Sequence, residues 1–397
     1  MKVITDADNP RAAITLGEGS RTVMLAGATI GAILLAVPAV LGDWHDFLKS
    51  YLVCFAFFLS ISLGGLFFVL LQHLTGASWS VVVRRLAEAI AANALLLAVL
   101  FLPIVAGMDT LYEWMHPAEN DHLLHGKHAW LNPTFWLIRV VVYFGVWALS
   151  ARWLLSMSVK QDETGDPALT TRLQKRSPLL MVLYALTVTY GAFDILMSLD
   201  PHWYSTIYGV YLWSGGLMAF FAFLAMFLFV LQRRGKLNEE VTEEHWHDVG
   251  KNLFAWMVFW AYIAFSQYML IWYANIPEET TWYATRQHGE WTTISLILLF
   301  GHFLLPFLFM LPRIMKRKPV IVTTFALWLF LMHYVDVYYL VVPHHGSEHV
   351  GFGLNDVLGF LGHLGLFVAG VTYTLSGCAL LPEKDPRLAE SLAFENV

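Results

Sequence analysis

Charged side chains are scarce in this sequence. Only 14% of its 397 residues are Asp, Glu, Lys or Arg, while 57% are hydrophobic and 15% are aromatic. Soluble domains carry about 25% charged residues. A chain this apolar is not soluble in water by itself, and lipid has to cover much of its surface. The composition therefore excludes an ordinary soluble domain and indicates an integral membrane protein.

Cysteine is almost absent, and this absence excludes several kinds of site. Cys54 and Cys378 are the only two, and both lie in apolar segments. A disulfide framework, a Cys-rich zinc site and a self-contained iron–sulfur cluster all need more cysteines. The C-x-x-C-H motif that attaches haem c does not occur. With a net charge of −6 and no basic domain, the chain also has no nucleic-acid motif.

Apolar segments long enough to cross a bilayer recur along the whole chain. A bilayer core takes about 20 apolar residues as helix. We predict an all-α integral membrane protein with about ten transmembrane helices. No secretory cleavage signature precedes the first apolar run, so we expect that segment to be retained. The spans lie near 22–41, 51–72, 86–107, 134–155, 178–199, 206–231, 252–274, 291–312, 319–341 and 356–380.

The distribution of Lys and Arg predicts the orientation of these spans. Twenty of the 24 fall in segments on the same side as the N-terminus. Three fall on the other side, Lys49, Lys127 and Arg286, and Arg139 lies within a span. Because basic residues concentrate in cytoplasmic loops, we expect both termini in the cytoplasm and a multi-pass location in a bacterial inner membrane.

Two spans end in similar sequences, and each contains a buried aspartate. The fifth ends in FDILMSLDPHW, with Asp194, and the ninth in VDVYYLVVPHH, with Asp336. An offset of four spans indicates two parallel four-helix bundles, spans 2–5 and 6–9, flanked by spans 1 and 10. The predicted segments are 1–21 (cytoplasmic N-terminal segment), 22–50 (first span and outer loop), 51–199 (first bundle), 200–341 (second bundle), 342–380 (outer loop and last span) and 381–397 (cytoplasmic tail).

Ionisable residues inside spans are the candidate functional residues. Each costs about 2.5–3.5 kcal/mol on insertion scales, so each needs a partner or a function. Asp194 lies about 9 Å deeper than Asp200, at 1.5 Å per residue. Arg139 lies at a similar depth on the preceding helix. An Arg139–Asp194 pair would neutralise both groups as a structural salt bridge, whereas a proton relay would give the carboxylate a function.

Histidines and a tyrosine accompany the second aspartate. His333 and Asp336 are three residues apart on one helix and share a face. With Asp194 and Arg139 they form our proposed proton relay. His302, His363 and Tyr338 are the weaker candidates, for a quinone pocket or for the relay. Cytochromes b usually place two His on one helix, and no span here has two, so the pattern disfavours haem b.

The outer loops contain histidines and aromatic residues. His122, His125 and His128 have the i, i+3 spacing that could present a metal. No carboxylate or Cys completes an obvious set, so we predict no metal site. The loops themselves could dock partner subunits on the outer side. They could equally be ordinary interfacial aromatics in solvated loops.

The stretch DILMSLDPHWYSTIYG, which begins at Asp194, resembles a known family. It is similar to the large membrane subunits of alternative complex III, a bacterial quinol:electron-acceptor oxidoreductase, within the wider NrfD/polysulfide-reductase family. A buried Asp followed by Met-Ser-Leu-Asp-Pro-His-Trp at the outer end of a helix is the motif that carries the likeness. The compact length and short outer loops look more like the ActF than the ActC paralogue.

This resemblance implies two four-helix bundles and no redox centre in this chain. It implies a paralogous ActC-type membrane subunit, a periplasmic iron–sulfur protein and multihaem cytochrome c subunits as partners, with haem c and iron–sulfur clusters held by them. Asp194 matches the family's buried carboxylate, and Asp336 is its candidate counterpart. The implied function is proton translocation in quinol oxidation, with a quinone site in this subunit left open.

Two other functions fit the residues. A free-standing secondary transporter would also have repeats and midplane charges, although paired Gly/Pro interruptions at matching positions are not evident. A purely structural anchor for periplasmic electron-transfer subunits would keep the salt bridges and need no proton path.

Overall fold

The computed structural model describes residues 13–345 and 349–395, and every regular element in these ranges is a helix. Ten helices are long and apolar enough to cross a membrane, which confirms the predicted fold class. The first 12 residues of the predicted N-terminal segment lie outside the described ranges. The spans are α1 (Gly19–Leu41), α2 (Trp44–Thr75), α3–α5 (Val81–Ala106), α8 (Pro133–Thr164), α9 with η2 (Ala168–Leu199), α10 (Tyr208–Arg233), α11 (Glu243–Ala274), α13–α14 (Trp291–Met310), α15 (Pro319–Val341) and α16 (Leu354–Ser376).

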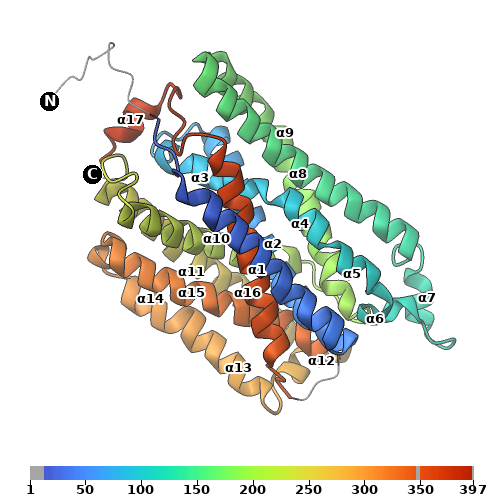
Figure 1. The fold of residues 1–397 in the computed structure, drawn as a ribbon. Coiled ribbons are helices and arrows are strands. Elements are labelled where there is room, and N and C mark those ends of the chain that lie inside the picture. Colours follow the sequence, from blue (N-terminus) through green and yellow to red (C-terminus); the bar gives the residue numbers. More distant parts are fainter. Residues whose placement is uncertain (1–12, 346–348, 396–397) are drawn as a thin grey trace, which may run out of the picture.

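Short helices connect the spans and mark the two ends of the molecule. They are α6 (Met108–Leu111), η1 (Glu113–Met115), α7 (His122–Lys127), α12 (Pro277–Arg286), η4 (Arg313–Lys316), η5 (Val342–His345) and α17 (Leu388–Leu392). Figure 1 shows α17 and the start of α1 at one end of the helix bundle, and α7 and α12 at the other. We call these ends the terminal face and the loop face.

The eight inner spans pack as two groups of four. In the first group α2 packs on α3 and α9, and α8 packs on both of these. In the second group α10 packs on α11 and α15, and α14 and its preceding turns pack on α11 and α15. The first helices of the two groups, α2 and α10, touch each other, and α1 pairs with α16 on the outside.

Glycines allow α2 and α10 to approach closely. A Cβ atom on Gly64 would lie 2.7 Å from the carbonyl oxygen of Gly216. A Cβ atom on Gly216 would lie 2.8 Å from the carbonyl oxygen of Ser60. Small residues at such crossings let the backbones of membrane helices meet. This contact joins the two groups of four.

Several helices extend well beyond their apolar segments. The predicted 134–155 span is part of the longer α8, which begins after Asn132 and ends at Gly165. The Oδ1 of Asn132 accepts the N–H of Phe135 as an N-cap, and Gly165 has φ +67°. Hydropathy locates the part of a helix that lies in an apolar layer, while capping residues locate its ends. The prediction therefore located the spans correctly and underestimated the lengths of several helices.

Two spans are interrupted. The third bends after α3 (Val81–Ala92) at Asn93, whose amide donates to the carbonyl of Phe367 on α16 at 2.9 Å. The eighth contains a π-helical turn, η3 (Leu298–Leu304), between α13 and α14. Pro306 has no N–H to donate to the carbonyl of His302, four residues earlier, which explains the irregular turn there.

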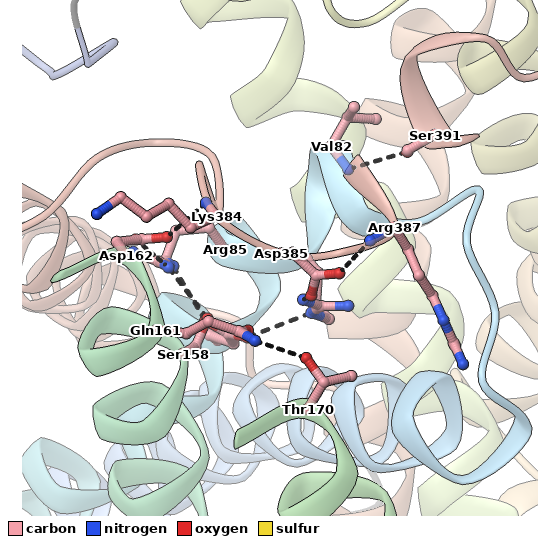
Figure 2. A network of polar contacts seen from close by, with 12 residues as sticks. Val82, Arg85, Ser158, Gln161, Asp162, Thr170, Lys384, Asp385, Arg387 and Ser391 are labelled. Carbon is pink, nitrogen blue, oxygen red and sulfur yellow. Dashed lines mark hydrogen bonds and ion pairs between the residues drawn. The ribbon is translucent and has the colours of Figure 1, made fainter. Parts of the chain in front are cut away.

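The segment after α16 folds back over the terminal face, and Figure 2 shows it against the first group of helices. Asp385 forms a buried ion pair with Arg84 of α3. The Ser391 hydroxyl donates to the carbonyl of Trp79 at 2.9 Å, and the Ser391 carbonyl accepts from His245 of α11 at 3.0 Å. Asp385 and Ser391 are thus packed against both groups of helices.

A buried charge cluster lies beneath this segment. Arg85 lies 3.1 Å from Glu88 and 2.7 Å from Asp162, and it also donates to Ser158 at 3.0 Å. Figure 2 shows Arg85 reaching from α3 toward Asp162 and Ser158 on α8. Arg84 lies 3.5 Å from Glu88, four residues later on the same helix. The polar residues in this half of the third span therefore have structural partners.

Candidate functional site

Asp194, near the end of α9, is held by four donors. Arg139 of α8 donates from Nε to Oδ2 at 2.7 Å and from Nη2 to Oδ1 at 2.8 Å. The Tyr143 hydroxyl donates to Oδ2 at 2.6 Å, and the Trp130 indole N–H donates to Oδ1 at 3.0 Å. Asp194 is 1% exposed and Arg139 is 7% exposed. The pair that the sequence suggested is therefore formed, in the bidentate geometry that is strongest for Arg and carboxylate.

Local structure fixes the orientation of this pair. The Arg139 guanidinium lies over the Trp130 ring at 4.1 Å and over Phe135 at 4.4 Å. The Asp194 carbonyl accepts from the Trp136 indole at 2.8 Å and from the Ser198 hydroxyl at 2.6 Å, where α9 ends. Aromatic rings thus cover the guanidinium while hydrogen bonds hold the end of α9 against α8.

A cavity of about 370 Å³ opens beside Asp194, near the loop face. Its volume is within the range of small-molecule sites in proteins, roughly 300–1,000 Å³. The wall is mainly apolar, with five aromatic residues and a few polar groups. The aromatic residues are Trp130, Tyr190, Phe193, Trp203 and Tyr204, and the polar ones include Asp194, Ser198 and Lys127.

Contacts between two loops form the mouth of this cavity. Lys127 donates to the carbonyl of Pro201 at 2.6 Å, and burial lowers the pKa of Lys127. His202 lies 2.7 Å from Asp121. The backbone N–H of Leu124, and next the His202 side chain, lower the pKa of Asp121. These contacts hold the segment around α7 against the turn that follows α9.

Asp336 of α15 has a different environment. It accepts the Tyr211 hydroxyl at 2.6 Å and the Trp260 indole N–H at 3.0 Å, and it lies 3.8 Å from Nδ1 of His333. It is 1% exposed. Within the described residues no Lys or Arg forms an ion pair with it. Its negative charge therefore has two hydrogen bonds but no permanent cation to balance it.

The two aspartates share two types of hydrogen-bond donor, but among the described residues only Asp194 is also paired with an arginine. Each accepts one tyrosine hydroxyl and one tryptophan N–H, and each lies on the fourth helix of its group. The donors come from α8 and the loop before it in one case, and from α10 and α11 in the other. The two sites thus use the same types of donor from helices that do not correspond in the two groups. That Asp336 is the counterpart of Asp194 stays a prediction.

Two histidines extend the Asp336 site. His333 shares a 2.9 Å hydrogen bond with the Ser60 hydroxyl of α2, so this site touches the first group of helices. His302, in the π-helical turn, lies 3.2 Å from the Met218 sulfur, and its ring centroid lies 3.7 Å from that of Trp260 with the rings tilted by 32°. The two imidazole centroids are 6.5 Å apart. The Nδ1 atoms of both have no hydrogen-bond partner among the described residues.

His363 and Tyr338 lie apart from this cluster. His363 is hydrogen bonded to the carbonyl of Gly359 at 2.9 Å and packs edge-on against Tyr51 at 4.6 Å. The Tyr338 hydroxyl donates to the carbonyl of Val350. The structure thus brings Asp336, His333 and His302 together and pairs Asp194 with Arg139, while His363 and Tyr338 make other contacts.

Sequence reasoning missed the donors to both aspartates. Tyr143 is four residues after Arg139, so the shared helix face could have identified it. Tyr211 and Trp260 have no such local signal, because only the packing of α10 and α11 against α15 brings them to Asp336. Tyr184 and Thr187 lie near the same face of α9 as Asp194, but they contact the Leu63 carbonyl and Trp147.

The comparisons with known proteins leave the chain without an assigned family. No family model matches it, and no curated protein matches it either.

Side chains that could hold a metal ion are grouped at one place among the described residues. Asp43, His45 and Asp46, at the start of α2, bring ligand atoms within 4.8 Å of one another. The first of them is an N-cap, whose carboxylate accepts from the backbone of the other two. His122, His125 and His128 do not form such a group in the described part of the chain.

Proposed function

We propose that this chain is an ActF-like membrane subunit of a quinol-oxidising, proton-translocating complex of the bacterial inner membrane. It would hold no redox centre of its own. Electrons would pass to a periplasmic iron–sulfur protein and multihaem cytochromes c, beside an ActC-type paralogue. The terminal face would lie in the cytoplasm and the loop face in the periplasm, in keeping with the 20-to-3 distribution of Lys and Arg.

The proposal rests on one observation: two carboxylates are buried at matching helices but are balanced differently. Asp194 has an arginine and opens onto an aromatic cavity. Asp336 has no arginine or lysine partner among the described residues and is near two histidines. A structural bundle needs neither the cavity nor the uncompensated carboxylate, and a buried ionisable residue costs free energy of insertion.

The Asp194 cavity is suited to the ring of a quinol. Tyr190, Phe193 and Trp203 offer flat apolar surfaces, and Asp194 and Ser198 offer polar atoms in the wall. A quinol hydroxyl could donate to a carboxylate oxygen there. Arg139 holds that carboxylate in a fixed orientation through two hydrogen bonds, so its oxygens are positioned to accept a further one.

Asp336 is suited to carry a proton. Proton uptake would remove its uncompensated charge, whereas proton uptake by Asp194 would leave Arg139 unbalanced. His333, 3.8 Å away, offers a neighbouring site that can also exchange protons, and His302 lies next in line. Chains of carboxylate and imidazole inside membranes commonly mark such relays.

Purification of the chain from its native membranes in mild detergent tests the proposal. We expect an iron–sulfur protein and c-type haem to co-purify, seen by subunit identification and a reduced-minus-oxidised visible spectrum. Asp336→Asn should abolish proton release coupled to quinol oxidation while assembly holds. A lone, colourless chain that remains stable would contradict the proposal and favour a transporter.

A structural anchor is the second candidate, and the Arg139–Asp194 pair favours it. That pair is fully hydrogen bonded and needs no ligand to be satisfied. An anchor predicts that Asp194→Asn and Asp336→Asn together leave turnover and proton release unchanged. Loss of proton translocation in an assembled double variant would exclude it.

A further inference from the structure

We propose that a buried tyrosine cluster between Asp336 and Ser205 is the route by which protons pass between Asp336 and the loop face. The inference rests on the proposed function, because it supposes that Asp336 exchanges protons. It adds the residues that would connect Asp336 to water: Tyr208, Tyr211, Tyr283, Gln267 and Ser205.

The first step is the hydrogen bond from Tyr211 to Asp336. The donor–acceptor distance is 2.6 Å, and the tyrosine is 4% exposed. Tyr283 and Tyr339 also contribute to the electrostatic environment of this hydroxyl. A phenol both donates and accepts, so Tyr211 can pass its hydroxyl proton to Asp336 and take a replacement from the other side, and the reverse order releases a proton.

Tyr208 marks a place for water in this cluster. It lies three residues before Tyr211 on α10, and thus on the same face. It is fully buried, yet its hydroxyl has no hydrogen-bond partner among the described residues. It interacts electrostatically with both Arg286 and Asp336. A buried hydroxyl without a protein partner is normally satisfied by an ordered water, which here would lie between the aspartate and the loop face.

The last step reaches the surface through three hydrogen-bonded side chains. The Gln267 amide donates to the Tyr283 hydroxyl at 3.0 Å, and the Ser205 hydroxyl donates to the Gln267 oxygen at 2.9 Å. Gln267 is 1% exposed, whereas Ser205 is half-buried and adjoins the exposed Thr206. Polar groups therefore continue from the buried amide to the loop face.

Arg286 holds this cluster in place. Its guanidinium donates to the carbonyls of Tyr339 and Leu340 at 3.0 and 3.2 Å, at the end of α15, and to that of Trp282 at 2.9 Å. Burial lowers the pKa of Arg286 to about 10, so it stays protonated at neutral pH. Because its protons are engaged with carbonyl oxygens, we assign it a positioning role and leave it out of the route.

Infrared spectroscopy of the full chain with its co-purifying partners tests the route. The carboxylic C=O stretch of protonated Asp336 is identified by its loss in Asp336→Asn. Transfer to D2O shifts this band as the proton exchanges, and the rate of the shift reports access to water. We expect Tyr208→Phe and Gln267→Met each to slow the exchange by about tenfold or more. The first removes the hydroxyl that would hold the water, and the second breaks the hydrogen bonds that join Tyr283 to Ser205.

Tyr334→Phe is the matched control. Tyr334 is on the same helix as Asp336 and is also buried, but its hydroxyl faces Cys54 at 3.8 Å, away from the route. In this variant the Asp336 proton should exchange at the wild-type rate. Wild-type exchange in both Tyr208→Phe and Gln267→Met would overturn the route and leave the proposed function standing. Absence of an Asp336 carboxylic band at every pH would overturn the proton role itself.

Discussion

Arg139 and Asp194 depend on each other for burial. Removing one partner of a buried ion pair leaves an uncompensated charge and costs about 3–5 kcal/mol. We therefore expect Arg139→Leu to lower the thermal unfolding midpoint strongly in detergent. Adding Asp194→Leu should restore much of the loss, because the apolar pair leaves no charge behind. Equal midpoints for the single and double variants would contradict this account of the pair.

Asp121 links the α7 segment to the turn beyond α9 in a pH-dependent way. Its native pKa is lowered, by the Leu124 N–H first and then by His202. The contact therefore stabilises the folded loop above the unfolded pKa of about 3.9 and is lost as the pH falls through the lower native pKa. Deuterium uptake around Leu124, corrected for intrinsic rates, should stay low from pH 7 to about pH 5 and rise below about pH 4.

Two variants separate this contact from general acid unfolding. Asp121→Asn should raise uptake around Leu124 at every pH, because the amide oxygen is a weaker acceptor than the carboxylate. Glu119→Gln changes an exposed carboxylate of the same loop and should behave like the wild type. Unchanged uptake in Asp121→Asn would show that the loop is held by its other contacts.

At the scale of elements, the crossing of α2 and α10 requires glycine. A Cβ on Gly64 would meet backbone on the other helix, and backbone cannot move aside as a flexible side chain can. Gly64→Ala should therefore cost about 1–3 kcal/mol, as overpacking does. Gly145→Ala on α8 is the control, since nothing lies within 4 Å of a Cβ there. Thermal unfolding of both variants in one detergent tests the contrast.

The elements themselves were largely predictable, and the reasons are physical. Ten apolar segments gave ten spans, because backbone in a bilayer core is forced to be helical. The Arg139–Asp194 pair followed from matched depths on neighbouring spans. The π-helical turn at His302 had only Pro306 as a signal, and the Asp336 donors had none. The depth of a residue in the membrane can be counted along its own helix. Which residues of two helices face each other depends on how the helices are rotated about their axes.

At the scale of the whole molecule, the C-terminal segment joins the two groups of helices. Asp385 pairs with Arg84 of the first group, and Ser391 is hydrogen bonded to His245 of the second. Asp385 and Arg84 are 6% and 3% exposed, so their charges depend on each other. Tail docking should therefore stabilise regions of both groups that are far from the tail in sequence.

Asp385→Asn tests this coupling. Glu88 remains 3.5 Å from Arg84 and still balances part of its positive charge. We therefore expect the free energy of unfolding to fall by about 3 kcal/mol, the low end of the range for buried pairs. Glu390→Gln on α17 changes an exposed carboxylate of the same segment and should leave stability unchanged. Hydrogen exchange should rise in Asp385→Asn both around Arg84 and around His245, since release of the tail frees both contacts. A rise confined to Arg84 would mean that the tail docks on the two groups independently.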